Sequence, residues 1–447
     1  MLATLRRATY IVSHLFRILS FGARLKSHLR VSLYTSAYHL ILGYTVTEGA
    51  GFVFWLIAAR IYSTTEMGLA AGAITATMFV ATFSTLGFAH SLIRFLPNSS
   101  QVSVLINSSI ALVALVAVAG AVIFLVGSSV WAPQLVVVRQ NGLLAFLFVI
   151  FALTSAVRPL LFSIFVAARR ARFVTILASC DSFLKLTFVM VFAATLAGVL
   201  RTFAAYFAWG IAVAAPVFLG VLLLIRLAYK SYRPGLSLAP APISQMFRFS
   251  LASYVSELSW FSPASGLIGW IMVLVVGNLL GVEQTAYFYI VWLIVAFLNV
   301  IPVSISSSLL AEGSYNEETV YVSARRSLRL AILVLVPIII VVLIVGNRFL
   351  LLFGDAYAVG GSTLLKVLAL SSLPLAYNSV SLGIWRVQRK LRPIVALGLV
   401  IALTSVVLTY TLSPRLGILS PGIAWLIAQS LGALLVGRTS WRRIASA

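Results

Sequence analysis

Charged residues are scarce in this chain. They make up 9% of its 447 residues, whereas hydrophobic residues make up 62%. Soluble domains contain about 25% charged residues, so this composition excludes a water-soluble globular fold. Acidic residues are the scarcest, 9 against 32 basic ones, which gives a formal net charge of +23. Without a hydrophilic fold, this excess does not indicate nucleic acid; we expect it to face anionic membrane lipids or an anionic substrate.

Cysteine is nearly absent. Cys180 is the single cysteine, which excludes a disulfide within the chain and a cysteine-based metal site. The four histidines lack ligand spacing, so we expect no metal and no cofactor. The sequence shows no nucleophile–base pair and no glycine-rich phosphate loop with its lysine. We therefore expect that the protein is not an enzyme.

Long hydrophobic runs fill the rest of the chain. A spanning helix needs about 20 apolar residues, and twelve stretches satisfy this, separated by short polar breaks. They predict an all-α, polytopic membrane protein with about twelve transmembrane helices in two six-helix bundles around a central cavity. The predicted spans are 33–59, 67–93, 103–127, 142–166, 173–196, 203–226, 249–279, 285–310, 327–346, 362–385, 394–413 and 418–437.

Basic residues alternate along these breaks. Of the 32 Lys and Arg residues, 24 fall in the two tails and in every second break, against 5 in the other breaks. Positive residues concentrate on the cytoplasmic side of membrane proteins. The bias therefore predicts a multi-pass protein of the cytoplasmic membrane with both termini in the cytoplasm.

The longest cytoplasmic connection divides the chain. Residues 229–247 contain three prolines and are predicted to link a first bundle, 33–228, to a second, 248–437. Residues 1–32 form a basic cytoplasmic segment, which is either a helix on the membrane surface or a solvated tail. Residues 438–447 form a second basic cytoplasmic tail.

The two halves show traces of a repeat. Laying the break at Glu66 on the break at Gln284 aligns the halves and places His39 on Glu257. In this repeat alignment, the glycine-rich stretch that begins at Glu48 falls on residues 266–269. Interrupted helices at matching places in two halves indicate a central site in transporters, although glycine is also common as a packing residue in spanning helices.

Three charged residues of spans four and five are predicted to lie close together. Arg158 and Asp181 lie about 13–17 Å above the turn that joins the two spans, at 1.5 Å per residue. Asp181 and Lys185 are four residues apart and share a helix face. The cluster either fixes helix packing or forms a positive cavity wall. In the second case Arg158 and Lys185 would bind a diphosphate, since guanidinium binds phosphate oxygens in a bidentate way.

Other polar residues inside the spans are further candidates, because charge in a bilayer is expensive. Glu48 is a candidate ion-coupling site, since a desolvated carboxylate can bind a proton; an ion pair with a basic helix is the alternative. Glu257 and His39 are candidate substrate-binding residues at the cavity rim, or hydrated interfacial residues. The charged ends of the Lys366 and Arg60 side chains are expected to extend to the membrane interface.

Several stretches, taken in order, resemble the polysaccharide transporter (O-antigen flippase-like) family of the multidrug/oligosaccharidyl-lipid/polysaccharide exporter superfamily. The resemblance implies two bundles around an alternately opening cavity, and transport of a polyprenyl-diphosphate-linked oligosaccharide for cell-surface polysaccharide assembly. It also implies that glycosyltransferases or polymerases are possible partners. Ser420-Pro421 departs from the family's usual pattern. The stretches are Glu66-Met67-Gly68, Thr85-Leu86-Gly87-Phe88-Ala89, Arg94-Phe95-Leu96-Pro97, Leu280-Gly281-Val282, Val300-Ile301-Pro302, Leu309-Leu310-Ala311-Glu312, Phe353-Gly354-Asp355-Ala356-Tyr357 and Leu416-Gly417-Ile418-Leu419-Ser420-Pro421-Gly422.

Two other functions compete with this interpretation. An ion-coupled multidrug or cation exporter of the same superfamily would need acidic cavity residues, for which Glu48, Asp181 and Glu257 could serve. A membrane glycosyltransferase or polymerase usually carries a large outward loop, whereas the longest outward break here, about Gly346–Gly361, is short.

Overall fold

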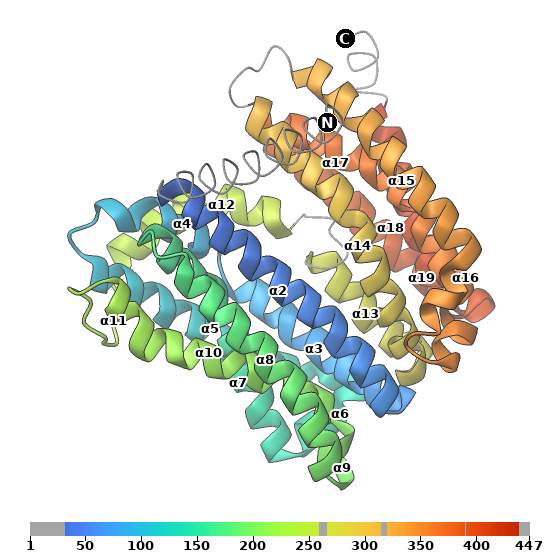
Figure 1. Cartoon of the computed structure of the whole chain (residues 1–447), viewed down its shortest axis with the longest axis horizontal. Helices are drawn as coiled ribbons and strands as arrows, with labels where there is room; N and C mark the ends of the chain where they lie inside the picture. Colours follow the sequence, from blue (N-terminus) through green and yellow to red (C-terminus); the bar gives the residue numbers. More distant parts are fainter. Residues whose placement is uncertain (1–31, 259–265, 314–319, 389, 438–447) are drawn as a thin grey trace, which may run out of the picture.

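A computed structural model describes residues 32–258, 266–313, 320–388 and 390–437. These residues form helices in two lobes, joined by turns and one longer linker (Figure 1). This confirms the all-α fold class. The basic segment predicted at the N-terminus, apart from Ser32, and the tail at 438–447 lie outside the described residues.

The first lobe contains the helices of the first six predicted spans. The short elements η2 (Pro133–Leu135), α6 (Val136–Gln140) and α9 (Gly198–Thr202) lie at the ends of these spans. The main helices of these spans are α2 (Ser32–Ile61), α3 (Thr64–Ser84), followed by the short α4 (Phe88–Phe95), α5 (Val102–Trp131), α7 (Gly142–Ala167), α8 (Arg172–Thr195), and α10 (Ala204–Leu219), which continues through η3 (Gly220–Leu224) into α11 (Ile225–Ala228).

The remaining helices lie in the predicted second half. Ten helical stretches of the described residues are long and apolar enough to cross a bilayer; α2 and the pair α12–α13 occupy the two other predicted spans. The chain is therefore a multi-pass membrane protein. The helices are α12 (Pro240–Leu258), α13 (Leu267–Leu280), α14 (Val282–Gly313), α15 (Val320–Leu350), α16 (Asp355–Leu370), α17 (Ser372–Val387), α18 (Leu391–Leu416) and α19 (Leu419–Val436).

Side chains cap the starts of two helices in the first lobe. Ser63 Oγ accepts from the Glu66 N–H at 3.2 Å, and the Ser63 N–H donates to Glu66 Oε2 at 2.8 Å. This reciprocal pair satisfies two donors that the first turn of α3 leaves free. Asn141 Oδ1 accepts from Leu143 N–H and Leu144 N–H at the start of α7. The polar breaks thus fix where these two spans begin.

The second predicted span is not one continuous helix. Leu86 and Gly87 have φ values of 50° and 71°, which separate α3 from α4. A left-handed backbone interrupts the i→i−4 hydrogen bonds, and glycine adopts it without steric cost. The predicted span 67–93 is confirmed over α3, and its helix ends before residue 93 because hydropathy does not report a left-handed backbone inside an apolar run.

The first helix after the linker, α12, packs on the first lobe. The hydroxyl of Tyr254 donates to the Phe83 carbonyl at 2.6 Å, and Ser91 Oγ donates to the Met246 carbonyl at 2.7 Å. Figure 1 shows α12 beside α4, on the side away from α15 and α16. There is no room for a side chain at Gly87, since a Cβ there would lie 2.8 Å from the Tyr254 Cβ.

The linker before α12 is fastened to the same lobe. Asn107 Nδ2 donates to the Arg233 carbonyl at 2.9 Å, and the Tyr232 hydroxyl donates to Asn107 Oδ1 at 2.8 Å. Ser103 Oγ accepts from the Arg233 N–H at 2.9 Å. The polar run at the start of α5 therefore binds the linker backbone. The division of the chain into bundles at 229–247 stays a prediction.

The helix boundaries follow the repeat alignment of the two halves. The first residue of α3, Thr64, aligns with Val282, the first residue of α14, and the start of α5 aligns with the start of α15. Across the lobes, α3 packs against α13 and α14. The end of the molecule that contains Thr64 and Val282 is called the closed end below, because the two lobes meet there. In Figure 1 the lobes diverge away from it, toward α4 and α17.

Candidate functional site

A pocket of about 610 Å³ lies within the first lobe, between α2, α3, α4, α7, α8 and α10. It contains two of the residues predicted from sequence, Glu48 and Arg158. The predicted cavity was to lie between the halves, whereas this pocket belongs to one lobe. Its polar lining residues are Thr47, Glu48, Thr82, Thr85, His90, Ser155, Arg158 and Ser163.

A proline in α7 places polar groups on the pocket wall. Pro159 follows Arg158 directly and lies inside α7. Proline has no N–H to donate to the carbonyl four residues earlier, which belongs to Ser155. Ser155 also has a buried hydroxyl with no described hydrogen-bond partner, and it lines the pocket. The wall beside Arg158 therefore offers unpaired polar groups.

The structure brings Arg158, Asp181 and Lys185 together as predicted. Arg158 Nη2 lies 2.9 Å from Asp181 Oδ2, and Lys185 Nζ lies 3.4 Å from the same oxygen. The Asp181 and Lys185 side chains are 1% and 6% exposed, whereas Arg158 keeps 23% of its side-chain surface exposed. Asp181 thus anchors both bases, and Arg158 is the member of the cluster that reaches the pocket.

Glu48 provides a second acid at this site. It is exposed on α2, where it lines the pocket together with Arg158. It is also within electrostatic reach of Lys185 on α8 and of Tyr289 on α14. With both acids ionised, the charges of Arg158, Lys185, Asp181 and Glu48 balance. The site is therefore less positive than the cluster in spans four and five suggests by itself.

Other candidates fall outside this group. Lys366 is exposed on α16 in the second lobe. His39 and Glu257 belong to α2 and α12, but their side chains lie outside what the structure describes. Their predicted roles at a cavity rim stay predictions.

Two aromatic residues of the pocket are not among the sequence candidates. The guanidinium carbon of Arg158 lies 5.3 Å from the centroid of the Phe162 ring, which is one helical turn away. A cation held over a ring keeps a defined orientation. Trp209 of α10 forms another part of the wall. The i,i+4 spacing of Arg158 and Phe162 could have predicted their contact from the sequence. The position of Trp209 in the pocket wall depends on how α10 packs.

The lobes are joined at the closed end by two equivalent contacts. Arg60, at the end of α2, donates from Nε and Nη2 to the Leu352 and Leu351 carbonyls at 2.8 and 2.5 Å. Asn278, which the repeat alignment places on Arg60, donates to the Val130 carbonyl at 3.1 Å. Each lobe thus offers a side chain to the backbone at the end of the other lobe's third span. Arg60 was expected to extend to the interface, and the structure adds that its exposed guanidinium bonds to the other lobe there.

The closed end also contains a polar cluster within the first lobe. Arg201 Nε lies 3.4 Å from Glu66 Oε1, and its guanidinium carbon lies 5.9 Å from the Tyr62 ring centroid. The Tyr62 hydroxyl donates to the Val189 carbonyl at 2.8 Å. Burial raises the pKa of Tyr62 from 10 to about 12, partly offset by the nearby Arg201 charge. This cluster holds the α2–α3 turn against α8.

This two-lobed arrangement is that of membrane transporters of known structure. An inward-facing multidrug resistance MATE family transporter of the MOP superfamily gives a TM-score of 0.65 at 14% identity, covering 91% of this chain and 98% of that chain. The lipid II flippase MurJ in an inward closed conformation gives 0.71 at 11% identity, covering 91% and 87%. An outward-facing MATE transporter gives 0.55 at 14% identity, covering 94% and 96%.

The comparison with sequence families covers a smaller part of the chain than the structural comparison. The family described as MatE matches residues 265–411, which lie in the second lobe and make up less than half of the chain. No curated protein sequence matches the chain. The fold is thus that of MOP-superfamily transporters, a class that includes both drug exporters and a lipid flippase.

Proposed function

We propose that the protein flips a polyprenyl-diphosphate-linked oligosaccharide across the cytoplasmic membrane, from the inner to the outer leaflet, for cell-surface polysaccharide assembly. The headgroup enters the first-lobe pocket while the polyprenyl tail stays in lipid. The lobes then rock against each other, so that the wall of the first lobe that holds the pocket opens to one leaflet and then to the other, as transporters with related halves do.

The observation that carries this proposal is the position of Arg158. It reaches the pocket with part of its surface free, while Asp181 and the Phe162 ring fix the orientation of its guanidinium. A diphosphate that leaves water needs charge-assisted hydrogen bonds in exchange. Lys185 is buried, pairs with Asp181 and does not line the pocket. Its role in this proposal is therefore indirect.

The proposed orientation assigns the closed end to the outside. The basic tails and breaks then lie on the cytoplasmic side, where they meet anionic lipids. The lobes meet at the closed end through Arg60 and Asn278, which corresponds to an inward-facing state. The higher TM-score against the inward-facing MATE transporter than against the outward-facing one supports this assignment. Glycosyltransferases or polymerases would then work on the two sides as partners.

A second candidate function is an ion-coupled multidrug or cation exporter. The specific observation in its favour is Glu48, an exposed carboxylate in the same pocket as Arg158. A carboxylate that binds a proton or a cation could couple an ion gradient to transport. In the flippase proposal, Glu48 takes the same coupling role for a different cargo.

The test is flipping by purified protein in proteoliposomes loaded with a fluorescent polyprenyl-diphosphate oligosaccharide. We expect Arg158→Ala to slow headgroup translocation about 10- to 100-fold, the loss of one charge-assisted hydrogen bond or two. Arg158→Lys keeps the charge and should retain part of the rate. Arg415→Ala, an exposed arginine outside the pocket, is the control and should not change it.

Exporter activity is measured in parallel. Drug resistance conferred on a sensitive host, together with wild-type flipping rates in Arg158→Ala, would overturn the flippase proposal. Loss of drug efflux in Glu48→Gln would then support the exporter. If neither cargo moved in the wild-type protein, both proposals would be wrong.

A further inference from the structure

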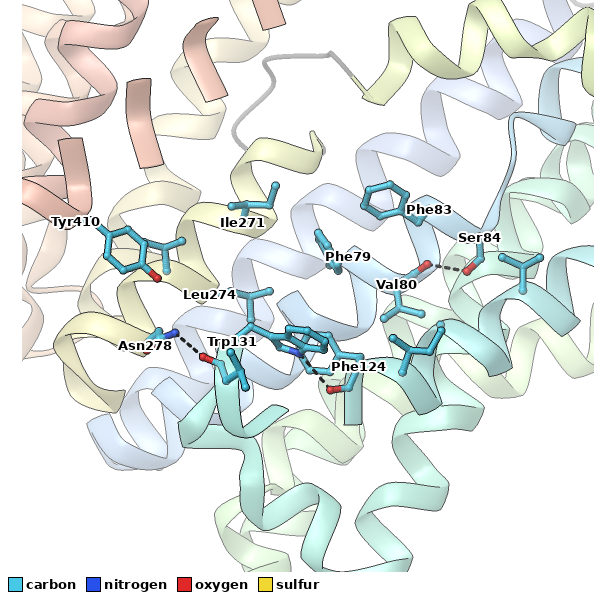
Figure 2. A pocket seen from close by; sticks show the side chains of 15 residues that line it. Phe79, Val80, Phe83, Ser84, Phe124, Trp131, Ile271, Leu274, Asn278 and Tyr410 are labelled. Atoms are coloured by element: carbon cyan, nitrogen blue, oxygen red, sulfur yellow. Dashed lines mark hydrogen bonds between the residues drawn. The ribbon is translucent and has the colours of Figure 1, made fainter. Parts of the chain in front are cut away.

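A second pocket, of about 560 Å³, lies between the two lobes on one side of the molecule (Figure 2). It is lined by α3 and α5 from the first lobe and by α13 and α18 from the second. Figure 2 shows Phe79 and Phe83 on one wall and Ile271, Leu274 and Tyr410 on the other. This pocket is distinct from the one that contains Arg158.

The pocket is apolar and continuous with the membrane-facing surface. Its rim contains Ile123 at 64% and Val130 at 73% exposure, both on α5. In a spanning helix, such exposed apolar side chains face hydrocarbon rather than water. The medium that reaches this pocket from the side is therefore lipid.

The repeat alignment identifies a matching place on the other side of the molecule. There, Phe297 takes the position of Phe79, and Phe349 takes that of Trp131. The ring of Phe52 lies 5.5 Å from that of Phe297, 6.3 Å from Phe349 and 5.6 Å from Phe353. Aromatic side chains of the protein itself therefore fill the groove between the lobes on that side.

Two residue differences between the aligned halves leave the groove on the first side unfilled. Trp270 stands where the other side has Phe52, and it is 8% exposed and does not line the pocket. Gly120 lines the pocket where the other side has Ile338. One groove is thus packed by the chain and its equivalent is not, although an apolar space between packed helices loses dispersion contacts along its whole lining.

We propose that this pocket binds one acyl chain of a bilayer phospholipid from the leaflet at the closed end. Trp131 and Asn278 lie at the mouth, where an aromatic ring and an amide suit the region of lipid headgroups. The helical stretch from Val116 to Trp131, which follows the pocket, is about 22 Å long. An acyl chain that spans one leaflet covers about half of the 30 Å hydrocarbon core, so the stretch is long enough to follow such a chain over its whole depth.

The chain would touch both lobes at once. Its contacts with Phe83 and with Leu274 exist only while the lobes meet as they do here. A ligand that binds one arrangement better than another shifts the population toward it. The acyl chain therefore acts as a lateral support for the closed end, in the role that Phe52 has on the opposite side.

The test is photo-crosslinking in proteoliposomes with a phosphatidylglycerol that carries a diazirine on its acyl chain. We expect adducts to concentrate on pocket residues, with Phe83 and Leu274 labelled together. They should be scarce around Phe52. The variant Ile123→Trp places an indole at the rim and should lower the pocket adducts about fivefold, the loss of about 1 kcal/mol of affinity.

The matched control is Val126→Trp. Val126 is 66% exposed on the same helix but does not line the pocket, so this variant should keep the wild-type adduct pattern. Adducts spread evenly over the exposed residues of α5 and α15, or an unchanged pocket yield in Ile123→Trp, would overturn the proposal.

Discussion

Gly68 of α3 lies directly against the backbone of Val282, the first residue of α14. A Cβ built on Gly68 would overlap the Val282 carbonyl oxygen. The contact joins the two lobes at the closed end, and only a residue without a side chain permits it. The aligned position in the second half is Ala286, so the close approach is a feature of one side.

We expect Gly68→Ala to push the lobes apart at the closed end. Overpacking against a backbone costs about 1–3 kcal/mol, which is enough to favour an arrangement in which the lobes separate at this end. The measurement is the distance between spin labels at Val137→Cys and Val359→Cys in a Cys180→Ser background. Both labelled positions are exposed, Val137 at 43% and Val359 at 86%.

Gly72→Ala is the control for this variant. Gly72 lies one turn further along α3, where a Cβ would meet Leu135 at an ordinary 3.7 Å. Its label distances should equal those of the wild type. Equal distances in Gly68→Ala as well would contradict the idea that this glycine sets the approach of the lobes.

Arg60 is expected to hold the same end closed by hydrogen bonding. Arg60→Ala removes two charge-assisted bonds to the Leu351 and Leu352 carbonyls, which should weaken the closed state by about 1 kcal/mol at this exposed position. The same spin-label pair should show a larger long-distance fraction. Arg60→Lys can make one such bond, so its long-distance fraction should lie between those of the wild type and Arg60→Ala. A distance distribution unchanged by Arg60→Ala would show that Arg60 does not hold this end closed.

Asp181 is expected to be essential for stability as well as for any role in binding. Asp181→Ala leaves the buried Lys185 without its ion-pair partner, and breaking a buried pair costs about 3–5 kcal/mol. We expect a clear drop in melting temperature in detergent. The double variant Asp181→Asn with Lys185→Met should recover much of it, because no unpaired charge remains on α8. Equal melting temperatures for the single and double variants would show that the pair adds no stability.

The linker contact predicts sensitivity to protease. Asn107→Ala removes one bond to the Arg233 carbonyl and one from the Tyr232 hydroxyl, worth about 2 kcal/mol together. Limited trypsin digestion should then cut faster after Lys230, whereas Arg233 is followed by Pro234 and is not a trypsin site. Asn98→Ala serves as the control, because Asn98 is exposed; equal cutting rates in the two variants would exclude an anchoring role for Asn107.

We expect the stability of the protein to depend on alkaline pH because of Tyr62. Its pKa is raised to about 12 in the fold because burial disfavours the phenolate. A raised pKa gives stability that is complete below pH 10 and is lost as the pH rises through 12. Tyr62→Phe cannot ionise there, so its melting temperature should decline less between pH 10 and 12. Parallel declines in both proteins would contradict this origin.

Local chemistry explains which features the sequence could predict. Hydropathy locates the spans because hydrocarbon tolerates few polar residues, and helical rise places Arg158 level with Asp181 on antiparallel neighbours. The break at Leu86 and Gly87 was not predictable in this way, since it depends on φ rather than on polarity. Trp209 enters the pocket wall only through the packing of α10, which no local pattern encodes.

The packing of α12 places α12 and α13 in different lobes, although together they align with the single helix α2. In the repeat alignment, residues 250–279 correspond to α2, yet α12 is bonded to Phe83 and Leu86 of the first lobe while α13 stands with the second. The boundary of the repeat alignment and the boundary of the helix packing therefore differ. A protein expressed as two complementary fragments should therefore keep α12 in the fragment that contains the first lobe, because a division within the proline-rich linker would separate α12 from the helix ends that it bonds.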